Sequence, residues 1–238
     1  MSVSKRKVAA LHFRQNIRRS NELHAEYLGN PSLLKSYDRF ANWQFDYLLP
    51  LFSDMYDRPG YAEAIDFTMS DLAGIGISNR DRDLERAATA ITNMLPLKAL
   101  TTISVAAEMN ARILKVNIGI CRSLLVNDEL PERITEYAYC IACRDASSLE
   151  ECLELVHLVT ELGRTLKSLI HIPMIGITLR AMRMPAHAAG FGALQEFLEN
   201  GYGTFRQIPD IEHFLSEIEL RMTDIFEKIY TTPLNQLP

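Results

Sequence analysis

The chain has 238 residues, of which 47% are hydrophobic and 23% charged, and its formal net charge is −5. This composition is that of a globular protein and excludes a disordered chain, and the mild negative charge removes any strong expectation that the protein binds nucleic acid. The 11 glycines and 10 prolines fall below the average of roughly 12% for the two together. Few turns and long helices or strands are therefore expected.

Helical periodicity extends over nearly the whole chain, because apolar residues recur at steps of three or four. It predicts an all-α fold, formed by a single domain over residues 1–238 with eight to ten helices. The loops between them are short, so sequential helices are expected to pack antiparallel. The expected helices cover about 5–28, 33–57, 61–73, 79–95, 97–125, 131–144, 148–171, 174–183, 186–200 and 210–230.

Capping and turn residues set several of these boundaries. Ser32 is expected to cap the second helix, and Ser78 or Asn79 the fourth. Pro50 is expected to kink or break the second helix, because proline removes a backbone hydrogen bond and clashes with the preceding turn. Pro185 is expected, for the same reason, to separate the eighth helix from the ninth.

The segment 97–125 has a rival interpretation as a strand. Val116, Ile118 and Ile120 alternate with polar or small residues, as they would in a half-buried strand. Apolar or small residues nevertheless recur at steps of three or four from 100 to 125, and so short an alternation arises easily by chance. The longer pattern predicts a helix.

The four cysteines lie inside apolar helical patterns, which is typical of reduced thiols in an intracellular protein. The basic N-terminus imitates the start of a signal peptide, but only residues 8–11 are apolar before His12 and Arg14 interrupt them. A secretory signal needs about 7 to 15 apolar residues, and no run approaches the ~18 of a membrane span. We therefore expect a cytoplasmic protein without a membrane span.

Charge is distributed unevenly along the chain. The N-terminal helix within 1–30 is basic, and the amphipathic C-terminal helix at 210–230 lies in an acidic stretch. Two interpretations remain open. These charged faces are solvated, as most are, or the basic segment docks on an acidic partner such as the C-terminal helix of a second copy.

One pair of residues, Glu154 and His157, has the spacing of a metal-binding ExxH motif, in which both side chains share a helix face. Di-iron bundles need two such pairs and two further glutamates, and the chain has one pair. With Glu150 and Glu161 these residues form a continuous polar stripe, which is typical of the exposed side of a helix. No metal and no cofactor are expected.

Cys140 and Cys143 form a CxxC motif. A zinc site requires a second suitably spaced pair of ligands, and a redox site favours a helix N-terminus, where the thiol pKa falls. This motif lies in the middle of an expected helix. Both residues are predicted to be buried thiols that pack as small apolar side chains.

The segment 78–86 is dense in alternating charges. Capping and surface pairs explain most of it, but so many charges within two turns indicate that some of them cross to another helix. The candidate members of such a charge network are Arg80, Asp81, Asp83 and Arg86.

The segment 180–195 is the most unusual stretch. Its small residues around a proline favour close packing of two helices. The alternative is a helix N-terminus after Pro185 that receives an anion. Its Gly-Phe-Gly sequence matches neither nucleotide-binding glycine motif. The candidate ligand or anion site consists of Arg180, Arg183, His187 and Gln195.

Several motifs, taken together, resemble the FFLEE-motif (FFLEELY) family of bacterial proteins over about residues 40–229. They are Arg80-Asp-Arg-Asp-Leu-Glu-Arg86, Leu95-Pro96, Ala107-Glu-Met109 and, most specifically, the stretch from Met182 to Arg206. The resemblance implies a helical, functionally uncharacterised protein and no activity. The motif that names the family aligns with 67–73, where Phe67, Asp71 and Leu72 fit it and Thr68, Ser70 and Ala73 do not. What remains of that motif is predicted to be core packing.

These patterns leave three functional hypotheses. The first is a non-enzymatic helical protein that acts through association with a protein partner or with itself. The alternative is a pocket between helices for a small apolar or anionic ligand, with Arg183, His187 and Gln195 near its mouth. The third is an enzyme that uses the charges of 80–86 with His187, although no convergent catalytic set can be placed in the sequence.

Overall fold

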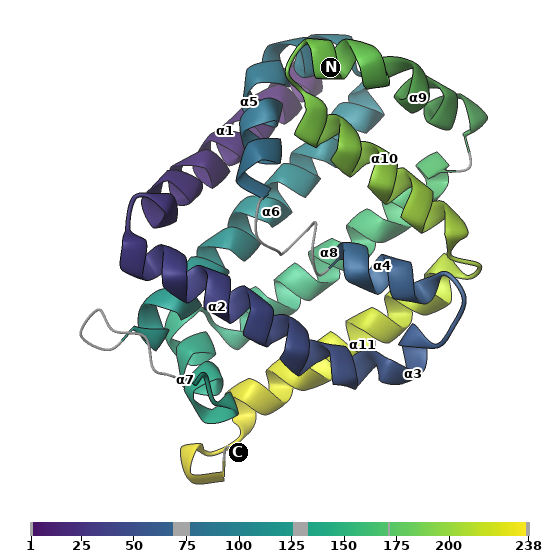
Figure 1. The fold of residues 1–238 in the computed structure, drawn as a ribbon. Coiled ribbons are helices and arrows are strands. Elements are labelled where there is room, and N and C mark those ends of the chain that lie inside the picture. Colours follow the sequence, from purple (N-terminus) through teal and green to yellow (C-terminus); the bar gives the residue numbers. More distant parts are fainter. Residues whose placement is uncertain (1, 69–76, 126–132, 171, 237–238) are drawn as a thin grey trace.

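The protein is described by a computed structural model over residues 2–68, 77–125, 133–170 and 172–236. Within these ranges every regular element is a helix (Figure 1), so the prediction of an all-α fold is confirmed. The helices are α1 (Ser2–Leu28), α2 (Pro31–Leu48), η1 (Leu49–Phe52), α3 (Ser53–Tyr56), α4 (Tyr61–Phe67), α5 (Ile77–Met94), α6 (Leu97–Leu124), α7 (Glu136–Ala146), α8 (Leu149–Ile170), α9 (Pro173–Ala188), α10 (Gly192–Gln207), α11 (Ile211–Thr231) and η3 (Leu234–Gln236).

Helix α6 runs through the middle of the molecule and contacts α1, α2, α7 and α8 (Figure 1). Its buried residues lie on several sides of the helix and include Leu100, Leu114 and Ile118, as expected for a helix in the middle of the fold. The helical interpretation of the segment 97–125 is therefore confirmed.

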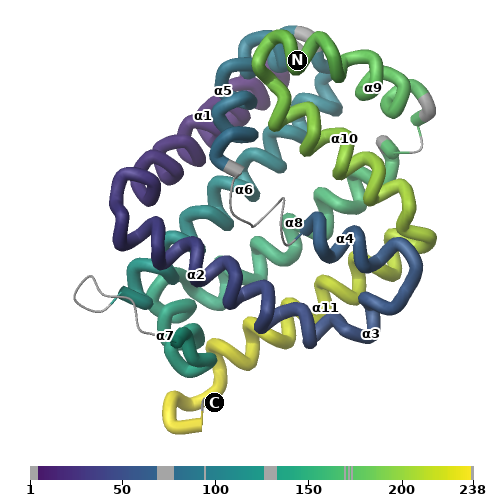
Figure 2. The backbone as a smooth tube through the Cα atoms, viewed as in Figure 1, coloured from purple at the N-terminus to yellow at the C-terminus, as the bar shows by residue number. Residues whose placement is uncertain are grey.

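The apolar side chains form two main cores. The larger lies between α1, α2, α6 and α7 and includes Tyr37, Phe40 and Tyr139. The second joins α3 and α4 to α10 and α11 around Met55 and Phe214. Figure 2 shows α11 along the side of the molecule opposite to the N-terminus. The apolar face predicted on this last helix contributes Ile229 to the larger core and Ile211 and Phe214 to the second.

Several boundaries differ from those predicted. Asn30 caps α2 by accepting a hydrogen bond of 3.1 Å from the Leu33 amide, so Ser32 is not the cap. Helix α5 begins at Ile77, which places Ser78 and Asn79 inside it. The expected break near Pro50 is present as the 3-10 helix η1. Residues 69–73 and 131–132 of two expected helices lie outside the described residues.

The largest boundary error concerns Pro185, which lies inside the last turn of α9 instead of between two helices. Proline there cannot donate to the carbonyl four residues before it, but only three residues of the helix follow it. The chain turns instead at Gly190, whose φ of 75° is left-handed. The amides of Gly190 and Phe191 donate to the carbonyls of His187 and Ala186, which is the Schellman pattern of a helix C-terminus.

Arginines from distant helices cap three helix C-termini, where unpaired carbonyls carry partial negative charge. Arg6 of α1 donates to Thr92 O at 2.7 Å and Leu95 O at 2.9 Å at the end of α5. Arg86 of α5 donates to Gly190 O at 3.1 Å after α9. Arg144 of α7 donates to Ile229 O at 2.7 Å, near the end of α11. These contacts fix the helix ends relative to one another.

Candidate functional site

A buried polar network lies where α1, α5 and α6 meet. Its centre is Asp81, which is completely buried. Asp81 Oδ2 lies 2.9 Å from His24 Nε2 of α1, and Asp81 Oδ1 accepts a hydrogen bond of 2.9 Å from Arg80 Nε. Asn110 of α6 donates to Asp81 Oδ2 at 2.7 Å. Three helices are thus joined through one carboxylate.

Further hydrogen bonds complete this network. Asn110 Oδ1 accepts from the Arg80 guanidinium at 2.7 Å, and its amide nitrogen also lies 3.0 Å from Ser20 Oγ. The other nitrogen of His24 lies 3.2 Å from the Tyr27 hydroxyl. A buried charge is tolerated when it is paired and hydrogen-bonded in this way.

Burial raises the pKa of Asp81, but the hydrogen bond from His24 and the positive charge of Arg80 outweigh it and hold the pKa below its ordinary value. The carboxylate form therefore favours the folded state. Its contribution to stability is present above the ordinary aspartate pKa of about 3.9 and is lost as the pH falls through the lower pKa of the folded state.

We therefore expect the free energy of unfolding to fall as the pH drops below about 4, and to fall less steeply in an Asp81→Asn variant. Urea denaturation followed by circular dichroism at a series of pH values measures both profiles. If the free energy of unfolding falls equally steeply with pH in both proteins, Asp81 does not contribute to the loss of stability at low pH. Glu22→Gln, a change at an exposed carboxylate of α1, is the control and should alter the slope far less than Asp81→Asn.

The structure brings the 80–86 charges into contact with the 180–195 segment. Asp83 Oδ2 lies 3.4 Å from the Leu194 amide in the first turn of α10, and Arg86 caps the preceding turn at Gly190. The Arg80 guanidinium lies 4.6 Å from the centre of the Phe197 ring, in a cation–π contact. The predicted network thus crosses to other helices, as the density of charge indicated.

The four residues of the candidate anion site lie along the contact between α9 and α10. Arg183 forms a two-pronged ion pair with Glu199, including a 2.9 Å hydrogen bond from Nε. Gln195 is buried and donates to the same carboxylate at 2.9 Å and to Leu179 O at 2.7 Å. Arg183 accordingly holds the pKa of Glu199 below its ordinary value. A carboxylate of the chain itself thus pairs with two of the four residues, Arg183 and Gln195.

The other two members of that candidate site lie on the surface. His187 is exposed, and its Nε2 lies 3.8 Å from Glu196. Arg180 is exposed and donates to Gly176 O of its own helix at 3.2 Å. The N-terminus expected after Pro185 does not exist, and the Leu194 amide at the real start of α10 faces Asp83. The arrangement is that of two helices fastened together.

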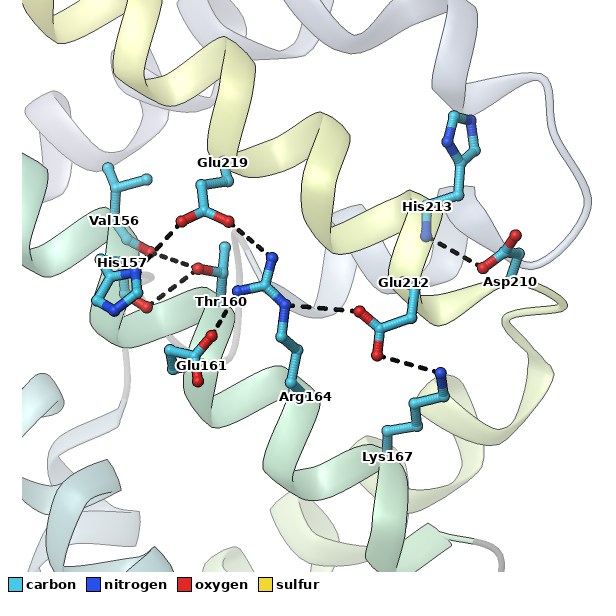
Figure 3. Close-up of polar contacts among 10 residues, drawn as sticks. All are labelled: Val156, His157, Thr160, Glu161, Arg164, Lys167, Asp210, Glu212, His213 and Glu219. Carbon is cyan, nitrogen blue, oxygen red and sulfur yellow. Dashed lines mark hydrogen bonds and ion pairs between the residues drawn. The ribbon is translucent and has the colours of Figure 1, made fainter.

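The four residues of the polar stripe on α8 are all exposed, as predicted. Figure 3 shows Arg164 between Glu161, Glu212 and Glu219, with Lys167 on the far side of Glu212. His157 Nδ1 lies 3.3 Å from Glu219 Oε1. The stripe is thus solvated, and its His157, together with Arg164 and Lys167 beside it, also pairs with carboxylates of α11. Among the described residues no three His, Cys, Asp or Glu side chains are grouped to hold a metal.

The CxxC cysteines are free and buried, as predicted. Burial raises the pKa of Cys143 to about 12, so its thiol stays protonated at neutral pH and is a poor nucleophile. Cys140 also has a pKa raised by burial. Both side chains pack in the larger core.

A groove of about 450 Å³ lies between α6 and α8. Its lining is mostly apolar and includes three threonine hydroxyls and two opposite charges. None of the four residues predicted for a ligand site lines it. The lining residues are Lys98, Thr101, Thr102, Val105, Glu161, Leu162 and Thr165.

The surface of α9 is the feature that sequence reasoning missed. The helix packs on α10 through Gly176 and Ala186, and a Cβ on Gly176 would lie 2.8 Å from the Tyr202 ring. Its opposite side presents large apolar residues to solvent, with exposed fractions of 63% for Met174, 54% for Ile177 and 78% for Met184. We define the α9 seam as the exposed residues Met174, Ile177, Ala181, Met184 and Ala188.

The basic N-terminal helix is not a free arm. Phe13 and Ile17 are buried against α5 and α6, and Arg6 and Arg14 bond to the end of α5. Removing residues 1–20 would therefore remove part of a core, and such a truncation cannot report on docking. No described helix has the length and apolar character to cross a membrane.

Comparison with known proteins gives a family and no activity. A family model described as a domain of unknown function, DUF8198, matches residues 24–235. Neither the curated proteins nor the solved structures contain a match to this chain. The family match does not test the resemblance to the FFLEE-motif proteins, which stays a prediction. Because the model covers nearly the whole chain, the protein belongs to the DUF8198 family, whose members share a domain of unknown function.

Proposed function

We propose that this chain is a non-enzymatic helical protein that acts by binding another polypeptide through the α9 seam. The observation that carries the proposal is the exposure of Met174, Ile177 and Met184 along one side of one helix. Folded proteins do not gain stability from apolar side chains left in water, and contiguous exposed apolar surface marks interaction sites. Methionine is common on such surfaces because its flexible side chain adapts to different partners.

Among the described residues, the exposed apolar residues of each other helix are fewer than those of the α9 seam, which supports the choice of this surface. Val8 and Leu11 lie on α1, and Leu220 lies on α11 among charged neighbours. Single exposed apolar residues of this kind are normal. On α9, by contrast, five exposed apolar or small residues follow one another along the helix.

The proposal is tested by placing a photoreactive amino acid at Met184 and, as a matched control, at Leu220, in the cells that produce the protein. We expect covalent adducts with a polypeptide from position 184 and far fewer from position 220, which is similarly exposed. Equal yields at the two positions, or no adduct from 184, would contradict the proposal.

A stability measurement separates a binding role from a structural one. We expect Met184→Glu to change the free energy of unfolding by no more than about 0.5 kcal/mol, as for most surface substitutions. The same change should abolish the adducts formed by a photoreactive amino acid placed at position 177. A loss of several kcal/mol would show instead that Met184 belongs to the core.

The α6–α8 groove supports the alternative of a small-molecule-binding protein. Its Val105 and Leu162 suit an apolar body, while Lys98 and Glu161 suit opposite charges at the ends of a ligand. Thr101 and Thr102 already donate to carbonyls of α6, so few polar groups converge on the groove, in contrast to most ligand sites.

The four buried free thiols support our proposal that the protein works in the reducing cytoplasm.

A further inference from the structure

We propose that the polypeptide bound by the α9 seam is a second copy of this chain, whose own α9 packs antiparallel against the first. This inference rests on the proposed function and names the partner at the same surface. The result is a two-fold homodimer in which the α9 seam of one copy contacts the α9 seam of the other, as in isologous interfaces generally.

The spacing of the seam is that of a coiled coil. The steps from Met174 through Ile177, Ala181 and Met184 to Ala188 are three, four, three and four residues, which is the a/d pattern of the heptad repeat. All five residues are exposed. Exposed a and d side chains on one helix can pack between the a and d side chains of a second helix with the same pattern.

The sizes of the side chains select the antiparallel direction. In the register that sets Ile177 opposite Ala188 of the second copy, Ala181 stands opposite Met184. Each of the four layers so formed pairs a large side chain with alanine, and Met174 lies beyond the last layer. A parallel pair would set Ala181 against Ala181 and Met184 against Met184, with a gap in one layer and crowding in the next. Cores pack best when large and small residues face one another.

The charge of the seam fits a second copy better than a charged partner. None of the five seam residues is ionisable, and Arg183 lies off the seam and pairs with Glu199. The exposed Arg180 and His187 flank the seam, one residue before Ala181 and Ala188. A membrane surface is a less suitable occupant, because interfacial helices present basic side chains and bulky Trp, Phe or Leu to the lipid. The seam offers Met, Ile and Ala.

The size of the seam sets the strength of the dimer. The 16 residues of α9 extend over ~24 Å at 1.5 Å per residue, and one face of such a helix falls short of the ~800 Å² per partner that a standard stable interface buries. We therefore expect a weak dimer that forms with rising protein concentration, and sedimentation velocity should show its mean mass increasing over the micromolar range.

Disulfide trapping tests both the partner and the direction. Ile177→Cys and Ala188→Cys are made as separate proteins and mixed under mild oxidation; the native thiols, being buried, do not compete. We expect intact-mass spectrometry to find the mixed 177–188 disulfide almost exclusively. The statistical mixture given by random collision, or an excess of 177–177 and 188–188 products, would overturn the antiparallel dimer.

Two controls complete the test. Ala181→Glu, which places a charge in the middle of the seam, should abolish the mixed disulfide and the rise in mass, and Leu220→Cys mixed with Ala188→Cys should give only the random yield. If wild-type protein stays monomeric at all concentrations while position 184 still forms adducts with a different protein in cells, the second-copy inference fails and the proposed function stands. If adducts are absent as well, both fail.

Discussion

Replacing Asp81 by alanine is expected to lower the free energy of unfolding by about 3–5 kcal/mol, the usual cost of removing one partner from a buried ion pair. Arg80, His24 and Asn110 are all buried around this carboxylate, and they would be left without their common acceptor. A single domain typically has only about 5–15 kcal/mol of stability, so the variant should be close to unfolding. Urea denaturation at neutral pH measures the loss.

The matched control for Asp81 is Arg82→Ala, a change at the neighbouring exposed residue of the same charged run. Surface substitutions usually stay within about 0.5 kcal/mol. A loss below about 1 kcal/mol for Asp81→Ala, comparable to an ordinary exposed hydrogen bond, would contradict the picture of a carboxylate that joins three helices.

Replacing Gly60 by alanine is the second change for which we expect a large effect. Gly60 precedes α4 with a φ of 78°, and a Cβ there would lie 2.4 Å from Gln207 O. The left-handed conformation alone costs a non-glycine residue about 1–2 kcal/mol, and the carbonyl is backbone at the end of α10, which cannot turn aside as a side chain can. We expect a total loss of at least about 2–3 kcal/mol, visible as a lowered midpoint in thermal unfolding.

Gly203→Ala is the opposite case and serves as the control. Gly203 lies inside α10, and a Cβ there meets nothing within 4 Å. Alanine is the better helix former by about 0.5–1 kcal/mol, so this variant should be more stable than the wild type. If both glycine variants destabilise the protein equally, the close approach at Gly60 is not the cause.

The sequence predicted most of the helices because their apolar periodicity is local information. The final helix illustrates this, since Ile211, Phe214 and Leu215 were expected to share a face and are all buried. Boundaries were less predictable where two signals competed. Pro185 predicts a helix end because it lacks a backbone N–H. The helix in fact continues past it, and Gly190, five residues later, supplies the left-handed turn that terminates α9.

The candidate site was predictable in part. The charge density of 80–86 indicated a crossing to another helix, but its partners His24 and Asn110 are isolated polar residues in apolar helices, and no local pattern marks them. The cations of 180–187 suggest a site for an external anion, because Glu199, the partner of Arg183, lies on the next helix and no local pattern marks it as that partner. The α9 seam was obscured because its alanines favoured close packing within the molecule.

The contact between α1 and α6 has a consequence for the newly made chain. Phe13 and Ile17 of α1 are buried by packing against α5 and α6, and α6 ends at Leu124. At the usual synthesis rate of about 5–20 residues per second, the stretch between α1 and the end of α6 takes roughly 5–20 s to emerge. Throughout that interval the apolar face of α1 is uncovered outside the ribosome, where a chaperone that holds amphipathic helices would meet it first.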